Sequence, residues 1–379
     1  MPKISSPWLR NTAEGRWYGL GRYLAMFPAS FAQQAIDHLT TKGEPVLDPC
    51  CGRGNGPFTA AVLGRPSVAI DINPAAWIFT ATKLQPEPDP DRVVSRLNEM
   101  GRATRARDKK SRSRFETMAW SPKVRAFLKA SRRELDWKGS RVDRTLMAFI
   151  ALHMQDKLGS GLSNAMSPTI AYSPDYAVKW WTMRGLSSPP DVDPIAMLAT
   201  KIRRRYECGV PTLAKGNAIL GDARVVLRKL PKIRAGLLIT SPPYCGAIDY
   251  WNDNWLRLWL LGHEFKKNWN KSAKYGCRAE YQELLQSIFG ESSRHLKPGA
   301  TVLVRAARQR DTATMCAKAM AETWPKRPIY ERPSTSPHRS ISVHHGRGGR
   351  IAKEIDLLIP GKHGKSWWED RGFMPCELV

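Results

Sequence analysis

Acidic residues and glycines gather after a short apolar run near the start of the chain. The segment VLDPCCGRGNG carries Asp48, followed by Gly52 and Gly54. Glycine lets the backbone approach a ligand closely, and a helix that begins after such a turn offers free N–H groups. A second acid, Asp71, ends the next apolar run, 23 residues after Asp48. An acid at about that spacing accepts hydrogen bonds from a ribose in Rossmann-like units, so the pattern favours a nucleotide-like ligand over a plain tight turn.

The loop lacks the G-x-G-x-x-G pattern of dinucleotide-binding proteins, which argues against a dehydrogenase. An acid that leads the glycine turn suits the cationic amino-acid end of S-adenosylmethionine, because a carboxylate can bind the α-amino group directly or through water. Asp48 is the candidate for that role.

A second motif, TSPPYCG, follows the apolar run GLLI and begins at Thr240. Two prolines fix the backbone, so Ser241 and the Pro242 carbonyl can point together at a planar amino group. Tyr244 can offer a ring on which a base stacks. A proline-stiffened turn is the structural alternative, and the upstream glycine loop favours the catalytic interpretation.

Together these motifs resemble the amino-methylating DNA methyltransferases, which modify N4 of cytosine or N6 of adenine. The resemblance rests on the cofactor loop, AIDINP as the ribose strand, GDA as the strand beside the cofactor adenine, TSPPY as the catalytic motif, and RYLAMFPASF ahead of the loop. It covers roughly residues 1–84 and 216–306, with a weaker echo in RGGRIAKEIDLLIP. It implies an α/β fold of the Rossmann-like class I S-adenosylmethionine-dependent methyltransferases, with a mostly parallel, doubly wound sheet and a basic inserted recognition region.

The resemblance assigns roles to residues at matching positions. The methionine end of the cofactor is expected at Asp48, Gly52 and Gly54, the ribose at Asp71, and the cofactor adenine at Asp222. Neighbours of these residues within the same motifs complete the cofactor candidates: Phe27, Pro49, Cys50, Ile72 and Ala223. The catalytic candidates are Ser241, Pro242, Pro243 and Tyr244. Serine at the first position of this motif is commoner in cytosine N4 enzymes, so N4 is favoured and adenine N6 is the alternative.

The pair Pro49 and Cys50 needs separate consideration, because a Pro-Cys pair carries the nucleophile of cytosine C5 methyltransferases. Here the pair opens the glycine turn and TSPPY occupies the catalytic place. Cys50 is therefore expected to be a packing residue, as is Cys245. The loop departs from the more usual D-P-F-C-G-S-G at Cys50, Cys51 and Arg53.

These motifs need a scaffold of parallel strands. Short apolar runs end at Pro49, Asn73, Ala223, Tyr244 and Ala306, with amphipathic stretches between several of them. Such alternation predicts a doubly wound α/β sheet. The run EIDLLIP near the C-terminus is expected to add an antiparallel strand. The predicted organisation is a cofactor-binding half over 1–85, an inserted recognition region over 86–215, and a catalytic half over 216–379.

The formal net charge of +26 favours a polyanionic partner, and double-stranded DNA is the expected one. In the insertion, KWWTMRG interleaves aromatic and basic side chains, as surfaces that bind nucleic acid do, although a tryptophan pair that anchors the insertion is as good an explanation. The loop SPHRSISVHHGRGGR can grip a DNA backbone or be a solvated basic hairpin. The DNA-binding candidates are Lys179, Trp180, Trp181, Arg184, Arg204, Arg347 and Arg350.

The seven cysteines include no C-x-x-C pair, and no metal site is expected. No signal peptide or run of 18 apolar residues is present, so a cytoplasmic protein of bacterial or phage origin without a membrane partner is expected. A cognate restriction system is a possible partner. Three rival functions remain: an RNA base methyltransferase, a protein-glutamine methyltransferase, and a catalytically silent DNA-binding protein.

Overall fold

A computed structural model describes residues 8, 10–23, 27–246, 249–264, 277–308, 311–334 and 354–378. The chain forms two compact units. One is helical and combines three segments of the chain, residues 1–22, 85–211 and 250–269; the other is an α/β unit formed by residues 23–84, 212–249 and 270–379. Arg347 and Arg350, the DNA-binding candidates of the C-terminal loop, lie outside the described residues.

The α/β unit contains one mixed sheet with the strand order β3-β2-β1-β4-β5-β7-β6-β8. Its strands are β1 (Val46–Asp48), β2 (Ser67–Asp71), β3 (Gly216–Leu220), β4 (Ala235–Thr240), β5 (Leu296–Ala307), β6 (Tyr330–Pro333), β7 (Glu354–Ile359) and β8 (Met374–Pro375). The pairs from β3 to β5 are parallel, whereas β7 runs antiparallel to β5 and β6. This order and direction are those of the Rossmann-like class I methyltransferase fold, so the predicted fold class is confirmed.

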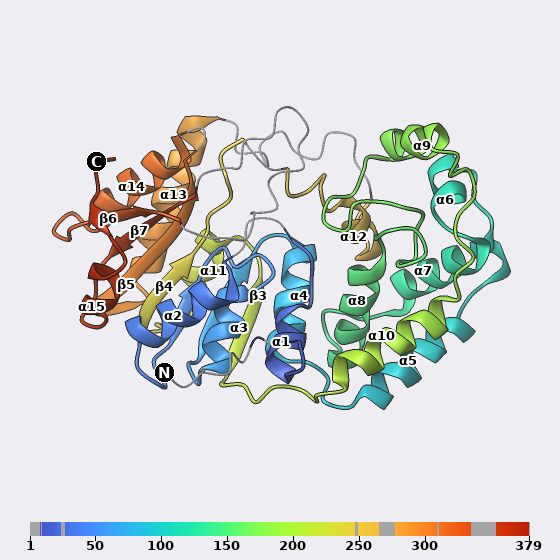
Figure 1. Ribbon diagram of the computed structural model, residues 1–379, viewed down its shortest axis with the longest axis horizontal. Helices are drawn as coiled ribbons and strands as arrows, with labels where there is room; N and C mark the ends of the chain where they lie inside the picture. Colours follow the sequence, from blue (N-terminus) through green and yellow to red (C-terminus); the bar gives the residue numbers. More distant parts are fainter. Residues whose placement is uncertain are drawn as a thin grey trace. The chain divides into compact units, whose positions relative to one another are not determined.

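Helices cover both faces of this sheet (Figure 1). They are α2 (Ala29–Leu39), α3 (Asn55–Val62), α4 (Pro74–Leu84), α11 (Ala223–Lys229), α13 (Arg278–Ser293), α14 (Thr312–Thr323) and α15 (Lys365–Glu369). Successive residues of a strand point to opposite faces. Accordingly, Leu238 packs against α11, α13 and α14, while Leu237 and Ile239 pack toward α2 and α15. All six residues of β4 are buried, which explains its uninterrupted apolar sequence.

The helical unit contains no strand between residues 85 and 211, all of which the structure describes. Its helices are α1 (Ala13–Tyr18), α5 (Pro90–Arg102), α6 (Arg114–Ala119), α7 (Pro122–Glu134), α8 (Arg141–His153), α9 (Pro174–Met183), α10 (Pro194–Tyr206) and α12 (Trp255–Leu260), with the 3₁₀ helix η1 (Ala106–Lys109). Several begin with a proline in the first turn after a polar residue, a strong helix start.

Residues from outside the insertion complete the core of the helical unit. The fully buried Trp17 of α1 contacts Tyr206 of α10 edge to face, with ring centroids 5.1 Å apart. The indole Nε1 of Trp255 in α12 donates to the Tyr172 carbonyl at 2.8 Å. The helical unit is therefore larger than the region that interrupts the α/β pattern in the sequence.

Candidate active site

The glycine loop between β1 and α3 is shaped by two residues with positive φ. Gly52 has φ 52° and Gly54 has φ 76°, both in the left-handed region that side chains disfavour. A Cβ atom on Gly54 would lie 2.6 Å from two atoms of the Thr80 side chain, on α4. Glycine is therefore required at position 54 for its backbone angle and for its lack of a side chain.

The buried side chain of Lys83, on α4, holds this loop in place through hydrogen bonds. Lys83 is fully buried, and its Nζ donates to the Arg53 carbonyl at 2.8 Å and to Asn55 Oδ1 at 3.3 Å. Asn55 in turn donates from Nδ2 to the Phe27 carbonyl at 2.9 Å. These bonds fix Phe27, a cofactor candidate, beside the loop.

Asp48, at the end of β1, lies almost completely buried behind the loop. Its Oδ1 accepts hydrogen bonds from Thr240 Oγ1 at 2.8 Å and from the Cys50 amide at 3.2 Å. Burial raises the pKa of the Asp48 carboxyl from 3.8 to about 7, although both hydrogen bonds act in the opposite direction. A carboxylate in this environment gains stability from a cationic ligand group.

Asp71, at the end of β2, faces the same loop. Its two carboxylate oxygens accept from the amides of Gly52 and Asn73, each at 2.8 Å. Burial raises its pKa from 3.8 to about 7 as well. The side chain of the next residue, Ile72, is 45% exposed, so an apolar surface lies open beside this acid. A nucleoside fits this arrangement, because its ribose hydroxyls can donate to the Asp71 carboxylate and its base can lie on the exposed Ile72 side chain.

The catalytic motif begins where β4 ends. Ser241 Oγ is buried and forms no hydrogen bond within the described part of the chain. It lines a small pocket whose other walls come from the cofactor loop and its neighbours: Phe27, Asp48, Cys50, Cys51, Arg53, Asn55 and Gly56. The structure thus brings the first residue of the catalytic motif and the leading acid of the cofactor loop to one pocket. A buried hydroxyl without a partner is costly unless a ligand or water supplies one.

The rest of the catalytic turn is held in place by residues that sequence reasoning missed. The fully buried Tyr281 of α13 donates from its hydroxyl to the Pro243 carbonyl at 2.7 Å. Tyr244 is only 3% exposed, and its hydroxyl donates to Glu354 Oε1 of β7 at 2.6 Å. Burial raises the pKa of Glu354, and the nearby Arg305 guanidinium partly offsets that effect. The Tyr244 ring is therefore fixed at its hydroxyl end.

Glu354 borders a buried cluster of charges on three adjacent strands. Arg305 of β5 and Arg332 of β6 both contact the completely buried Asp356 of β7, at 2.7 Å and 3.1 Å. The Arg305 guanidinium also lies 4.1 Å from the centre of the Phe31 ring. No local motif in the sequence marks this cluster, since its members are far apart along the chain.

The remaining cofactor candidates lie on the same unit. Asp222 caps α11 and accepts from the Arg224 amide at 2.9 Å, and it also forms a 2.6 Å ion pair with the Arg224 side chain. That ion pair and its hydrogen bonds lower the pKa of Asp222. Ala223 is buried at the start of α11. Pro49 lies in the turn between Asp48 and the glycines.

The two cysteines of the loop are poor nucleophiles. Burial raises the pKa of Cys50 and Cys51 well above the ordinary thiol value, with the neighbouring acids adding to the effect. The thiolate is the reactive form of cysteine. Cys50 packs against the core of the sheet, and Cys245 is 3% exposed. These environments agree with the packing roles expected for both residues.

The DNA-binding candidates of the insertion divide between the surface and the core. Trp181 is completely buried, and its Nε1 donates to the Ala165 carbonyl at 2.6 Å, so it anchors the insertion and presents no surface to DNA. Trp180 is partly exposed, with the Arg184 guanidinium 4.1 Å from its ring centre. Lys179 and Arg204 are exposed. The helical period of the sequence distinguishes the buried tryptophan from the partly exposed one. Trp181 is four residues after the buried Ala177 and so lies on the same, buried face of α9.

Within the described ranges, no group of three or more His, Cys, Asp or Glu side chains is arranged to hold a metal ion. Among the helices described, none has the length and apolar character needed to cross a membrane.

No protein-family profile and no curated protein matches the chain. Solved structures match it at low similarity. They include the rRNA methyltransferase aviRa from Streptomyces viridochromogenes (13% identity, 89% of this chain, 86% of that chain, TM-score 0.31). A putative rRNA methylase from Clostridium thermocellum matches at 9% identity over 89% of this chain and all (100%) of that chain, with a TM-score of 0.34. TrmN from Thermus thermophilus matches at 12% identity over 88% and 48% of the two chains, with a TM-score of 0.31. With TM-scores this low, the matches indicate nothing about the activity of this chain.

Proposed function

We propose that this chain transfers a methyl group from S-adenosylmethionine to an exocyclic amino nitrogen of a base in DNA. The observation that carries the proposal is the buried hydroxyl of Ser241, which has no hydrogen-bond partner among the described residues and lies in the same small pocket as Asp48. A site for amino methylation needs an acceptor for the amino group beside a site for a cationic donor. These two residues supply both.

The residues of the loop fit S-adenosylmethionine. Asp48 can bind the α-amino group, Asp71 can accept from the ribose hydroxyls, and the exposed Ile72 can cover one face of the adenine. The small pocket holds only part of such a ligand, so the fit rests on the loop and the two acids together. When bound, the cofactor supplies a methyl group on a positively charged sulfur.

Asp222 is the weakest member of the proposed cofactor set. Its carboxylate is already occupied by Arg224, at 2.6 Å. An adenine amino group would have to share the carboxylate with this guanidinium. We retain Asp222 and Ala223 beside the adenine because they follow β3, which pairs with β2 and its Asp71.

The catalytic work assigned to this chain is positioning. The amino lone pair of a base is delocalised into the ring, so Ser241 Oγ and the Pro242 carbonyl accept hydrogen bonds from the NH₂ group and favour a more tetrahedral nitrogen. The two prolines hold both acceptors in place. The Tyr244 ring, fixed through Glu354, supports the base. A target in a duplex must leave the base stack to reach these groups.

We favour N4 of cytosine over N6 of adenine as the target. Both bases present an NH₂ group beside a ring nitrogen, so the acceptor pair serves either. The choice rests on Ser241, since serine at this position resembles the cytosine N4 enzymes. A neutral hydroxyl also accepts more weakly than a carboxylate, which leaves more of the positioning to Pro242 and Tyr244.

The test is methyl transfer from labelled cofactor to duplex DNA, single-stranded DNA and RNA, followed by mass spectrometry of the nucleosides. We expect N4-methylcytosine in DNA. Methylation of RNA alone would overturn the DNA assignment, and N6-methyladenine without N4-methylcytosine would overturn the choice of base. Ser241→Ala and Tyr244→Ala should each slow transfer, whereas the control Ser293→Ala at the end of α13 should not. Full rates in both site variants would refute the site itself.

A further inference from the structure

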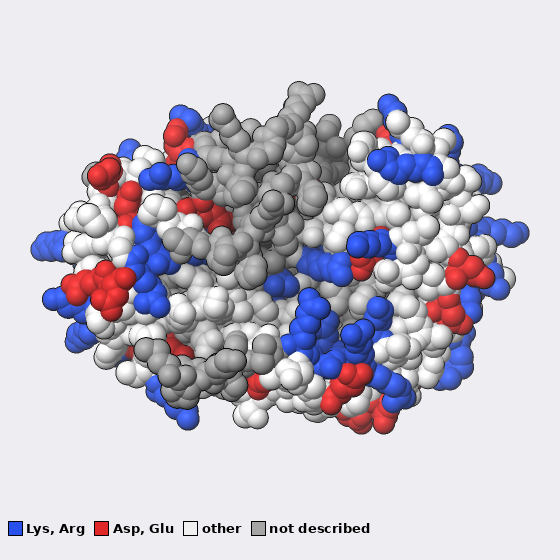
Figure 2. All heavy atoms as spheres, in the orientation of Figure 1, with Lys and Arg blue, Asp and Glu red and all other residues white. Residues whose placement is uncertain are grey.

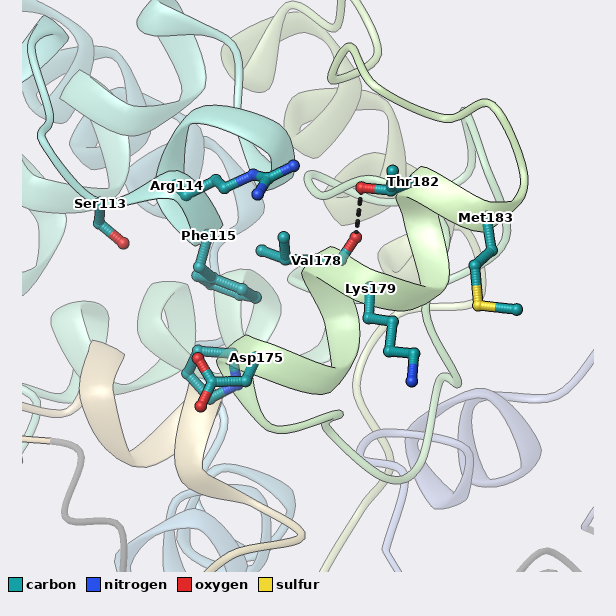
Figure 3. A pocket seen from close by; sticks show the side chains of 9 residues that line it. Ser113, Arg114, Phe115, Asp175, Val178, Lys179, Thr182 and Met183 are labelled. Carbon is teal, nitrogen blue, oxygen red and sulfur yellow. Dashed lines mark hydrogen bonds between the residues drawn. The ribbon is translucent and has the colours of Figure 1, made fainter.

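A second cavity lies within the helical unit, between the start of α6 and one side of α9 (Figure 3). Its volume is about 540 Å³, within the range of sites that bind small organic groups. The lining residues are Ser113, Arg114, Phe115, Pro174, Asp175, Val178, Lys179, Thr182 and Met183. None of them belongs to the catalytic turn or the cofactor loop.

The floor of this cavity is apolar and rigid. Phe115 is 6% exposed and stacks on the buried Trp181, with ring centroids 5.5 Å apart and planes at 29°. Its ring also contacts Trp255 edge to face at 5.1 Å. Val178 lies beside it in Figure 3. A flat, preorganised floor of this kind suits a planar ring, because little side-chain freedom is lost when the ring binds.

The rim of the cavity is cationic. Arg114 and Lys179 are both exposed, and within the described part of the chain neither side chain forms a hydrogen bond or ion pair. In the view of Figure 3, the Arg114 guanidinium lies on one side of Phe115 and the Asp175 carboxylate on the other. Arg114 and Lys179 lie at separate places on the rim, and each can bind a phosphate, while Asp175 can accept from an N–H group on the edge of a base. Figure 2 shows basic side chains and little acidic surface around α9.

The other flank of α9 carries a row of aromatic side chains that are partly or fully exposed. Tyr176, Trp180 and the C-cap residue Arg184 are spaced four residues apart and therefore share one side of the helix, and Tyr172 lies just before its start. The Tyr172 ring lies 5.2 Å from Tyr176 and 5.7 Å from Trp180. Tyr176 is 53% exposed, and Met183 at the edge of the cavity is 72% exposed. Large exposed apolar side chains at one helix mark an interaction surface.

We propose that this cavity binds one unpaired nucleotide of the nucleic-acid substrate, with the base on Phe115 and its flanking phosphates at Arg114 and Lys179. The inference rests on the proposed nucleic-acid substrate, and it adds a second contact point, distinct from the target-base site. The formal charge of +26 and the aromatic row favour a nucleic acid over a neutral or cationic ligand. A base inside an intact duplex cannot reach the floor, so the nucleotide must be single-stranded or extruded.

Two kinds of variant separate the base from the phosphate. Thr182→Phe fills the cavity and leaves both cations in place, whereas Arg114→Gln with Lys179→Gln removes the cations and leaves the floor. Matched controls are Arg102→Gln and Lys157→Gln, which are exposed basic positions of the same unit outside the cavity. Binding is measured by fluorescence anisotropy at several salt concentrations. The probes are labelled single-stranded DNA, single-stranded RNA, a fully paired DNA duplex and the same duplex with one bulged nucleotide.

We expect the wild-type protein to bind the bulged duplex more tightly than the paired one, and Thr182→Phe to abolish that difference. The double charge variant should weaken binding of every probe by about tenfold and lower the slope of log K against log salt by about 1 to 2. Comparison of the DNA and RNA strands shows which of the two the cavity accepts.

Equal binding of all probes by Thr182→Phe and the wild type, with unchanged melting temperatures, would overturn the proposal. So would an effect of Thr182→Phe that is as large on the paired duplex as on the bulged one, because that pattern indicates a phosphate groove. These measurements need no methyl transfer. A protein that transfers no methyl group but still binds the bulged duplex more tightly than the paired one would contradict the proposed function and leave the nucleotide-binding cavity supported.

Discussion

Thr240 Oγ1 donates a 2.8 Å hydrogen bond to Oδ1 of Asp48, and this bond joins the last residue of β4 to the last residue of β1. The two residues belong to the two motifs that carry the proposed chemistry. Because β1 and β4 are neighbours in the sheet, the bond couples the position of the cofactor loop to that of the catalytic turn.

Thr240→Val should therefore weaken the binding of S-adenosylmethionine. The variant keeps the side-chain shape but leaves Asp48 with one fewer donor, and the loss of a hydrogen bond to a charged group costs about 1.5 to 3 kcal/mol. Titration calorimetry measures the affinity. Thr200→Val is the control, since that hydroxyl only bonds back along α10, at 2.9 Å. Equal affinities for wild type and Thr240→Val would show that the bond is not needed.

Asp71→Ala should weaken cofactor binding by about 1 to 3 kcal/mol, because the charge-assisted hydrogen bonds to the ribose are lost. Asp71 also holds the Gly52 amide at 2.8 Å, so the melting temperature has to be measured as well. Asp71→Asn separates the two effects, since it keeps an acceptor for the loop and loses the charge. Unchanged affinity in calorimetry would remove Asp71 from the site.

The pH dependences of stability and of cofactor binding should have opposite signs. The pKa values of Asp48 and Asp71 are raised by burial to about 7. A carboxyl with a raised folded-state pKa contributes its stability fully below the unfolded value of 3.8, and that contribution is lost as the pH rises through about 7. The melting temperature of the ligand-free protein should thus fall between about pH 4 and about pH 7 and stay level above pH 7.

Affinity for S-adenosylmethionine should rise over the same interval, since the ionised carboxylates bind its amino group and ribose better. Calorimetric titrations and thermal scans at a series of pH values test both slopes. Asp71→Asn should flatten each of them. An affinity that stays constant across neutral pH would contradict the proposed pairing.

Gly54→Ala should destabilise the α/β unit by more than Gly43→Ala does. Both glycines have positive φ, 76° and 83°, so both substitutions carry the backbone cost of about 1 kcal/mol or more. Only at Gly54 would the new methyl group meet the Thr80 side chain at 2.6 Å; nothing lies within 4 Å at Gly43. Denaturant titrations measure the difference. Similar losses at both positions would mean that the loop can move away from α4.

Charge reversal at Arg184 or Arg204 should weaken DNA binding and reduce its salt dependence, while cofactor affinity stays the same. Arg184 is stacked on Trp180 at the exposed flank of α9, and Arg204 is exposed on α10. Filter binding at several salt concentrations tests this prediction. Lys157→Glu is the control for a general loss of positive charge. A uniform effect of all three reversals would locate the recognition surface elsewhere.

The parts of the molecule that follow local patterns could be predicted from the sequence. The strands of the parallel sheet appear as apolar runs because both faces of the sheet are covered, and the run EIDLLIP predicts the added antiparallel strand β7. The glycine loop and the S-P-P-Y turn are visible in the sequence because their backbone needs particular residues at fixed spacing.

Contacts between distant residues could not be predicted. Arg305 and Asp356 are 51 positions apart, and the pairing of their strands decides that they meet. Likewise, nothing near Tyr281 shows that its hydroxyl bonds to Pro243. A helix sequence shows which face of the helix is buried but not which element packs against that face. The sequence therefore does not show that residues 1–22 and 250–269 belong to the helical unit.

The three-segment construction of the helical unit limits how its surface can change during evolution. Trp17 and Trp255 come from outside residues 85–211, yet they pack on Tyr206 and Phe115, which lie within that range. Exchange of the central segment alone with that of another protein would expose these two tryptophans, unless the incoming segment matched them. We therefore expect a new sequence preference to arise more readily from single substitutions on helices such as α9 than from replacement of the whole insertion.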